Sequence, residues 1–257
     1  MSALTLAARD NSTMIRRQLR RLVRYPSMTI QLIITPVILL LVFVYVFGGT
    51  LGSGLGGGRD TYIDYVVPGI LLMAAATAAT GTAVMVATDM TEGIIARFRT
   101  MRISRASVLT GHVVGSLIQQ LLGMVALIVI AVAIGFRPNA TAVEWLAATG
   151  LLVLFILAIT WLAVALGLRA QSPEAASNAP MPLILLPFLG SGFVPTESMP
   201  TALRWFAEYQ PFTPIMETLR GLLLGTPIGN SGAIAIAWSA GIALVAYFWA
   251  KNTFDKA

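Results

Sequence analysis

The chain alternates long apolar runs with short polar connections, a pattern typical of proteins built from membrane-crossing helices. Roughly 20 apolar residues cross the hydrocarbon core of a bilayer as a helix, so each run is assigned to one crossing. We expect six transmembrane helices, at about residues 27–47, 64–88, 107–134, 143–168, 180–194 and 232–250. The fifth run is short and rich in proline and glycine, so we expect that helix to be bent or broken.

Composition supports the same class. With 57% hydrophobic and 11% charged residues, the chain is not a soluble globular domain. The connections are too brief for a folded soluble domain, so we expect one all-α integral membrane domain over residues 1–257. It divides into a cytoplasmic interfacial helix (1–26), a six-span domain (27–250) and a cytoplasmic tail (251–257). The absence of cysteine excludes disulfides, thiol nucleophiles and cysteine-based metal sites.

Charged residues avoid the centres of the apolar runs, and this narrows the function. A charge in hydrocarbon is costly and marks ion paths and proton relays, so its absence argues against an ion-coupled transporter. The only lysines are Lys251 and Lys256, and neither belongs to a phosphate-binding G-x-x-x-x-G-K loop. The sequence therefore indicates a translocation pathway without an energy source of its own.

Two other functional classes remain open. A secondary transporter or channel needs charges at mid-membrane or a series of polar side chains along a pore, and the runs contain only scattered Thr, Ser and Gln. A membrane-embedded enzyme needs clustered His, Asp or Glu near an interface. The carboxylates Asp60, Asp64, Glu197 and Glu208 are isolated in the sequence.

The basic residues predict the orientation in the membrane. Thirteen of the seventeen Lys and Arg residues fall on the side of the N-terminus, and four, Arg59, Arg137, Arg204 and Arg220, fall on the other side. Because short cytoplasmic loops of membrane proteins are rich in Lys and Arg, we expect both termini in the cytoplasm. The net charge of +6 is thereby assigned to topology and not to nucleic-acid binding.

The segment before the first run predicts an amphipathic helix. At about 100° per residue, Ile15, Leu19, Leu22 and Val23 fall on one face. Five arginines fall on the other face: Arg16, Arg17, Arg20, Arg21 and Arg24. Such a helix lies in the membrane interface, with its arginines toward anionic headgroups. Two roles remain open for it, a topology anchor and the docking of a partner protein.

A second amphipathic helix is expected in the connection after the second run. Asp89 is placed to cap its start, with Glu92 three residues further on in the capping-box position. One apolar stripe follows at spacings of four, four and three, formed by Met90, Ile94, Phe98 and Met101. A short capped helix of this kind suits insertion into a groove of a soluble partner. The alternative is an interfacial connector.

Two segments are expected on the outer side. The run from Gly48 to Gly58 contains seven glycines and predicts a flexible loop. The segment 195–231 contains two apolar stripes too short to cross, flanked by aromatic residues, which predicts two helices dipping into the outer leaflet. Thr213 is expected as the N-cap of the second helix, and Gly225 marks its end.

Few polar side chains lie inside the apolar runs. The candidate pathway-lining residues are Gln31, Thr77, Thr80, Gln119 and Gln120. Polar side chains at such depth commonly hydrogen-bond between helices, and contact with a substrate is the alternative role. The small residues from Ala74 to Ala83 predict close packing of the second helix on a neighbour. His112 is the only histidine and has no cysteine or clustered carboxylate beside it in sequence, so we expect no metal site there.

Together these features resemble the membrane subunit of a type-2 ABC exporter, in particular the permeases of the daunorubicin-resistance kind. One stretch that carries the resemblance is T-E-G-I-I-A-R-F-R-T-M-R-I-S-R, Thr91 to Arg105. The others are S-G-F-V-P-T-E-S-M-P, Ser191 to Pro200, and Q-P-F-T-P-I-M-E-T-L-R-G-L-L-L-G, Gln210 to Gly225. Two positions depart from the family pattern: Arg102 stands where proline is usual, and Gln210 where asparagine is usual.

The resemblance implies the permease subunit of an ATP-driven exporter for a hydrophobic or amphipathic substrate, such as a drug, lipid or glycolipid. It implies that two six-span subunits, identical or different, pair in the bacterial plasma membrane above two ATP-binding-cassette subunits. ATP and Mg²⁺ would bind on those partners, so we expect no catalytic site, cofactor or metal in this chain.

The same resemblance assigns roles to the two amphipathic segments and to the outer helices. The helix after the second span becomes the coupling helix received by the ATPase, the N-terminal helix flanks the same cleft, and the outer helices form a re-entrant pair before the sixth span. The coupling residues are then Asp89, Met90, Glu92, Gly93, Ile94, Arg97, Phe98, Met101 and Arg102.

Overall fold

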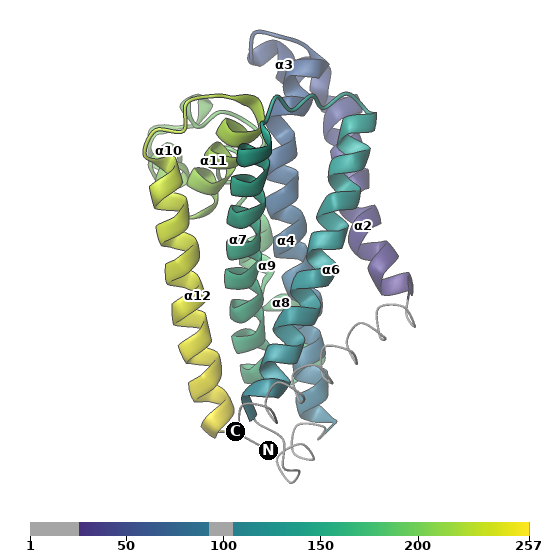
Figure 1. Ribbon diagram of the computed structural model, residues 1–257, viewed down its shortest axis with the longest axis vertical. Coiled ribbons are helices and arrows are strands. Elements are labelled where there is room, and N and C mark those ends of the chain that lie inside the picture. The colour runs from purple at the N-terminus through teal and green to yellow at the C-terminus, as the bar shows by residue number, and fades with distance from the viewer. Residues whose placement is uncertain (1–25, 93–104, 257) are drawn as a thin grey trace.

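The structure is a computed structural model that describes residues 26–92 and 105–256, and within these ranges it contains no strand. Five segments are long and apolar enough to cross a membrane: Ile33–Gly54, Arg59–Thr91, Thr110–Ala133, Ala142–Arg169 and Ser231–Phe254. They run side by side along the long axis of the molecule (Figure 1). They correspond to five of the six predicted runs, as expected of an all-helical, multi-pass membrane protein.

The first crossing is built from three consecutive helical elements. These are α2 (Pro26–Leu41), the π-helical turn η1 (Val42–Phe47) and α3 (Gly48–Gly54). The prediction of a flexible loop starting at Gly48 is therefore wrong for the first seven residues of that run. Gly52 packs so closely on the backbone of Gly58 that no side chain fits between them. Glycine disfavours helix in general, but here its small size lets the end of the helix fold back against the chain leading into the next one.

Two helices form the centre of the protein, α4 (Arg59–Thr91) and α7 (Ala142–Arg169). α4 packs on the first crossing, on α6 (Arg105–Ala133) and on α7, and α7 packs on the last helix. The small residues of α4 are buried, in particular Ala75, Ala76, Ala78, Ala79 and Ala83. The prediction that this face packs on a neighbouring helix is confirmed.

The fifth predicted run is broken, as expected from its prolines. It holds α9 (Met181–Leu185), preceded by α8 (Pro173–Asn178) and followed by turns as far as the 3-10 turn η2 (Thr196–Ser198). No single helix in the described ranges extends over the whole of residues 180–194. Figure 1 shows α8 in the lower half of the molecule and α9 above it. Short helices and turns therefore take the place of one continuous helix along this side of the bundle.

Two short helices lie at the upper end in Figure 1, α10 (Thr201–Tyr209) and α11 (Phe212–Leu224). They lie within the segment where two short helices were predicted, and most of the apolar stripe of α11 is buried: Ile215, Met216, Leu219 and Leu223. Gly225 ends α11 with a left-handed φ of 74°, as predicted. Thr213 lies inside the helix, so its prediction as N-cap is wrong.

The last helix, α12, spans Ser231–Lys256 and is longer than the predicted run. The predicted tail at 251–257 is therefore a continuation of this helix as far as Lys256. α12 packs on α7 and α11, and many of its large apolar side chains are exposed, as expected for a surface that faces lipid.

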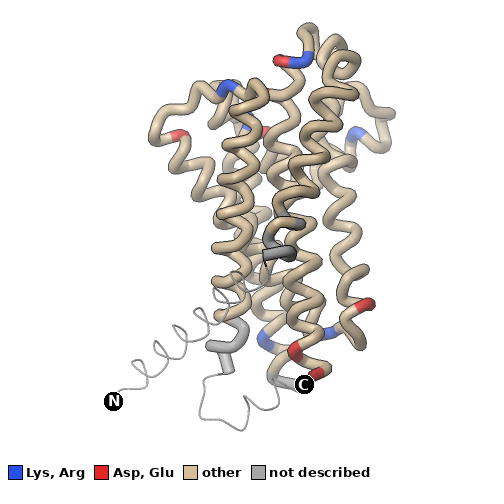
Figure 2. The backbone as a smooth tube through the Cα atoms, turned by 90° about the vertical axis from the view of Figure 1, so that its right-hand side faces the viewer, with Lys and Arg blue, Asp and Glu red and all other residues tan. Residues whose placement is uncertain are grey.

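Charged residues lie toward the two ends of the bundle, and none of the described residues at mid-height of the bundle is charged (Figure 2). The four arginines predicted on the outer side lie in or beside elements of the upper end: the start of α4, the end of α6, α10 and α11. Arg169 and Lys251, predicted on the other side, lie in the last turns of α7 and α12 at the lower end. The structure thus separates the two groups.

Candidate functional site

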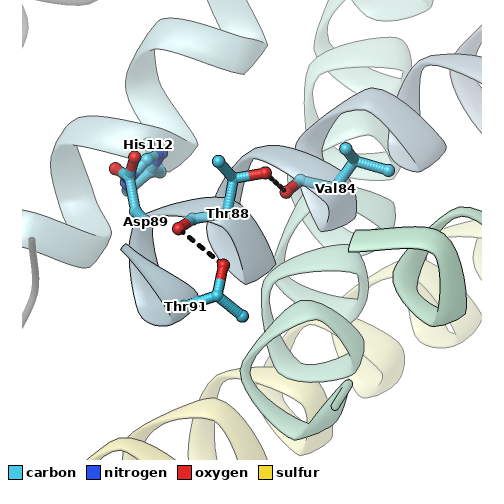
Figure 3. Close-up of polar contacts among 5 residues, drawn as sticks. All are labelled: Val84, Thr88, Asp89, Thr91 and His112. Atoms are coloured by element: carbon cyan, nitrogen blue, oxygen red, sulfur yellow. Dashed lines mark hydrogen bonds and ion pairs between the residues drawn. The ribbon is translucent and has the colours of Figure 1, made fainter. Parts of the chain in front are cut away.

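The lower ends of α4 and α6 meet through a buried pair of side chains. His112 Nε2 lies 3.1 Å from Asp89 Oδ2, and each of the two residues is 3% exposed. Asp89 lies in the last turn of α4 and points toward His112 on α6 (Figure 3). The prediction that Asp89 caps a separate helix is wrong, because α4 continues to Thr91 and Glu92 is its C-cap.

The end of α4 is reinforced by hydrogen bonds from its own threonines. Thr88 Oγ1 donates to the carbonyl of Val84 at 2.9 Å, and Thr91 Oγ1 donates to the carbonyl of Thr88 at 3.1 Å (Figure 3). The N–H of Glu92 donates to the same Thr88 carbonyl at 2.9 Å. The threonine side-chain bonds run back to a carbonyl three or four residues earlier, so they tie these hydroxyls to the backbone of the same helix.

A buried polar stripe runs along α6 at intervals of four residues, formed by His112, Ser116 and Gln120. Above the histidine, Ser116 Oγ accepts a hydrogen bond of 3.0 Å from Thr82 Oγ1 of α4. Gln120 Nε2 donates to Thr160 Oγ1 of α7 at 3.1 Å. The stripe therefore joins α6 to both central helices. The sequence singled out Gln120 and His112, and their spacing of eight residues was the signal that would have added Ser116.

Gln120 also faces a small cavity between α2, α4 and α6. The cavity walls are otherwise apolar, and Ile33, Pro36 and Ala75 are among its lining residues. Gln120 Oε1 is buried without a hydrogen-bond partner. The predicted hydrogen bond between helices is confirmed for Gln120.

The other candidate pathway-lining residues do not share this cavity in the described part of the chain. Thr77 is half-buried and donates to the carbonyl of Met73 at 2.9 Å. Thr80 Oγ1 is buried without a partner, and Gln119 is half-buried. Gln31 lies in α2, but its side chain is outside the described residues.

Most of the predicted coupling residues also lie outside the described residues. Met90 is half-buried in the last turn of α4, and Glu92 is exposed at its end. Six residues fall in the range that is not described: Gly93, Ile94, Arg97, Phe98, Met101 and Arg102. The same holds for the N-terminal helix with Arg16, Arg17, Arg20, Arg21 and Arg24.

At the upper end, α11 holds the turn that follows α9 against α4. Arg220 Nη2 donates to the carbonyl of Ser191 at 2.8 Å and to the carbonyl of Tyr65 at 3.2 Å. The guanidinium carbon of Arg220 lies 3.9 Å from the centre of the Tyr65 ring. We call these three residues the upper clasp. The clasp joins three segments that are far apart in the sequence.

Glycines allow the backbone of this turn to approach its neighbours. A Cβ at Gly69 of α4 would lie 2.5 Å from the carbonyl oxygen of Gly192. Tyr62 of α4 donates from its hydroxyl to the carbonyl of Phe193 at 3.2 Å. The S-G-F stretch noted in the sequence is thus a tightly packed contact with α4.

Gln210 supports the start of α11 from the residue before its N-cap, Pro211, a role that the sequence did not indicate. Its Oε1 accepts a hydrogen bond of 3.0 Å from the N–H of Phe212, at the start of α11. Its Nε2 donates to Thr213 Oγ1 at 3.0 Å. Thr213 Oγ1 in turn accepts from the N–H of Ser191 at 3.3 Å. Glutamine therefore joins the start of α11 to the turn at Ser191, at the position where the resemblance led us to expect asparagine.

A cavity of about 690 Å³ opens beside the clasp, between the upper ends of α4, α6 and α11. Its polar lining includes Asp60, Asp64, Arg137 and Arg220. Asp64 Oδ1 accepts a hydrogen bond of 3.1 Å from the N–H of Arg137. Within the described residues, no group of three or more His, Cys, Asp or Glu side chains could hold a metal ion.

Comparison with known proteins identifies the class of this helical arrangement. The family described as ABC-2 type transporter matches residues 9–224. The daunorubicin resistance ABC transporter permease protein DrrB1 of Streptomyces coeruleorubidus is 26% identical over 223 residues, which cover 86% of this chain and 77% of that protein. The probable doxorubicin resistance ABC transporter permease protein DrrC of Mycobacterium tuberculosis (strain CDC 1551 / Oshkosh) is 25% identical over 214 residues, which cover 83% and 78%. Because the family match extends over most of the chain, this protein belongs to the ABC-2 type transporter family.

Proposed function

We propose that this chain is the permease subunit of an exporter that moves a hydrophobic or amphipathic compound, with ATP hydrolysed by a separate subunit. The observation that carries the proposal is the family match over residues 9–224. The names of two similar permeases, which concern daunorubicin and doxorubicin resistance, suggest a drug as cargo, and a lipid or glycolipid is the alternative of similar amphipathic character. The described part of the bundle has no charge at mid-height (Figure 2), which suits a cargo that is largely apolar.

In this proposal the chain crosses the bacterial plasma membrane six times, with α8, α9 and the turns after them forming the fifth crossing. The excess of Lys and Arg on one side supports a cytoplasmic position for both termini. The upper end, with α10 and α11 as a re-entrant pair, then faces outward. A second permease, identical or different, completes the membrane part, and ATP with Mg²⁺ binds only on the ATPase.

The segment that begins at the lower end of α4 and extends to Arg102 is the proposed coupling helix. Asp89 and Met90 belong to α4, so the coupling helix begins after the transmembrane helix ends and not at Asp89. The N-terminal basic helix flanks it at the same surface. An ATP-binding-cassette subunit would receive both.

The test is gentle purification of the tagged chain from native membranes, followed by mass spectrometry of the proteins that accompany it. We expect an ATP-binding-cassette subunit in stoichiometric amount and ATP hydrolysis in the eluate. A chain that repeatedly purifies without any such subunit would contradict the proposal and favour a secondary transporter or channel. The proportions of permeases in the eluate would also distinguish a homodimer from a heterodimer.

The proposed orientation predicts that a cysteine at position 54 reacts with a membrane-impermeant maleimide on intact cells. The chain has no cysteine of its own. Gly54 is exposed, and a Cβ there meets nothing within 4 Å, so Gly54→Cys is a benign label site. The matched control is Asn252→Cys, an exposed position near the end of α12, which should react only after permeabilisation. The reverse pattern would invert the topology.

A further inference from the structure

Asp89 and His112 stand on the two helices that flank the proposed coupling helix. α4 ends at Thr91 and α6 begins at Arg105, so Asp89 lies in the last turn before the connecting residues and His112 lies two turns after them. Their contact of 3.1 Å joins the two helices near both ends of this connection. Both ends of the segment that would receive force from an ATPase are therefore held together inside the protein.

The burial of Asp89 and His112 strengthens their contact between α4 and α6. A hydrogen-bonded pair with a carboxylate gains strength where water is excluded, and breaking such a buried pair is destabilising. At 3% exposure, neither side chain can replace its partner with bulk water without moving the helices apart. Separation of α4 from α6 at this level is thus disfavoured.

Above the pair, the polar stripe continues the connection into the membrane part. Ser116 bonds to Thr82 of α4, and Gln120 bonds to Thr160 of α7. These bonds hold α6 against both central helices above the level at which Asp89 and His112 join α4 to α6.

We propose that Asp89 and His112 are positioning residues that make the lower ends of α4 and α6 move as one unit when the coupling helix is displaced. This inference rests on the proposed function, because it assigns to the pair the transfer of movement from the ATPase to the membrane helices. Neither residue touches ATP or cargo in this role. Loss of the pair would let the coupling helix move without carrying α6 along.

The test compares ATP-dependent uptake of doxorubicin into inside-out vesicles with the rate of ATP hydrolysis in the same complex. Asp89→Ala and His112→Ala should each lower uptake per ATP hydrolysed by about fivefold or more, in the range of typical coupling energies. The exchange variant, Asp89→His combined with His112→Asp, should restore the ratio to within about twofold of the native value. Recovery by exchange is not expected of residues that serve packing alone.

The matched control lies one turn further along the same stripe. Ser116→Ala removes one buried hydrogen bond between α4 and α6 but leaves the Asp89–His112 contact intact. It should lower stability slightly and keep the uptake per ATP within about twofold. Native coupling in both single alanine variants would overturn the inference, as would an exchange variant that folds with native stability yet remains uncoupled.

The design separates this inference from the function on which it rests. Phe98→Ala alters the proposed coupling helix directly and should uncouple the complex whatever the pair does. If Phe98→Ala uncouples and the alanine variants of the pair do not, the pair has no positioning role and the proposed function stands. A native complex that neither hydrolyses ATP nor takes up doxorubicin would contradict the proposed function, and the inference would fall with it.

Discussion

Replacing Arg220 with alanine is expected to lower the apparent melting temperature of the purified protein by about 6–12 °C. The change removes two hydrogen bonds from a charged donor, at 2.8 and 3.2 Å, and a stacking contact with Tyr65 at 3.9 Å. Hydrogen bonds to charged groups contribute about 1.5–3 kcal/mol each, and a desolvated cation–π contact about 2 kcal/mol. Because the surroundings relax in part, we take a loss of about 3 kcal/mol in the free energy of unfolding. Each kcal/mol lowers the melting temperature of a protein of this size by roughly 2–4 °C.

Two further variants serve as controls for this prediction. Arg204 lies on the neighbouring helix α10 and pairs with Glu208 at 2.7 Å, but the two side chains are 45% and 40% exposed. Exposed pairs contribute little because water and salt screen them, so Arg204→Ala should change the melting temperature by no more than about 2–4 °C. Arg220→Lys keeps the charge but loses the planar fork that reaches two carbonyls, and an intermediate loss is expected. Thermal unfolding in detergent, followed by tryptophan fluorescence, measures all three. Equal melting temperatures for the two alanine variants would contradict the role of the clasp.

The clasp also indicates which features of the fold could be predicted from the sequence. The apolar stripe of α11 and its stop at Gly225 are local, since helix periodicity and a left-handed cap depend on neighbouring residues. The contact of Arg220 with Ser191 and Tyr65 joins residues 29 and 155 positions away. Such contacts depend on how helices pack and turn against each other, and no local pattern contains that information.

Two wrong predictions have local causes. The glycines from Gly48 onward disfavour helix, but the first crossing continues through them as far as Gly54 because Gly52 must pack on the backbone of Gly58. Asp89 with Glu92 matches a capping box, and acidic residues are favoured at the start of a helix and not at its end, so the local pattern indicated a helix start. In the structure Asp89 lies inside α4 and contacts His112, a partner that no local pattern reveals.

Among the polar residues inside the membrane helices, some contacts could be predicted from the sequence and others could not. Membrane depth and residue type were enough to predict that Gln120 would bond between helices, which is confirmed by its contact with Thr160. They were not enough to find Ser116, Thr82 or Thr160, because Ser and Thr are common in membrane helices and often bond to their own backbone. Thr77 does so, and only the packed structure distinguishes it from Thr82.

The second large effect is expected at Gly167, where α7 crosses α4. A Cβ at this position would lie 2.5 Å from the carbonyl oxygen of Ala83 and 3.0 Å from Val86 Cβ. A backbone oxygen cannot move aside as a flexible side chain does, so Gly167→Ala must push the two central helices apart. Overpacking of this kind costs about 1–3 kcal/mol. We expect the melting temperature to fall by roughly 4–8 °C, from a loss of about 2 kcal/mol.

Gly150 on the same helix provides the matched control, because it is exposed and a Cβ there meets nothing within 4 Å. Alanine is favoured over glycine inside a helix by about 1 kcal/mol, so Gly150→Ala should leave the melting temperature unchanged or raise it by about 2–4 °C. The same substitution on one helix is thus expected to act in opposite directions, and the difference isolates the contact with α4 from helix propensity. Similar shifts in the two variants, measured by thermal unfolding in the same detergent, would contradict the close crossing of α4 and α7 at Gly167.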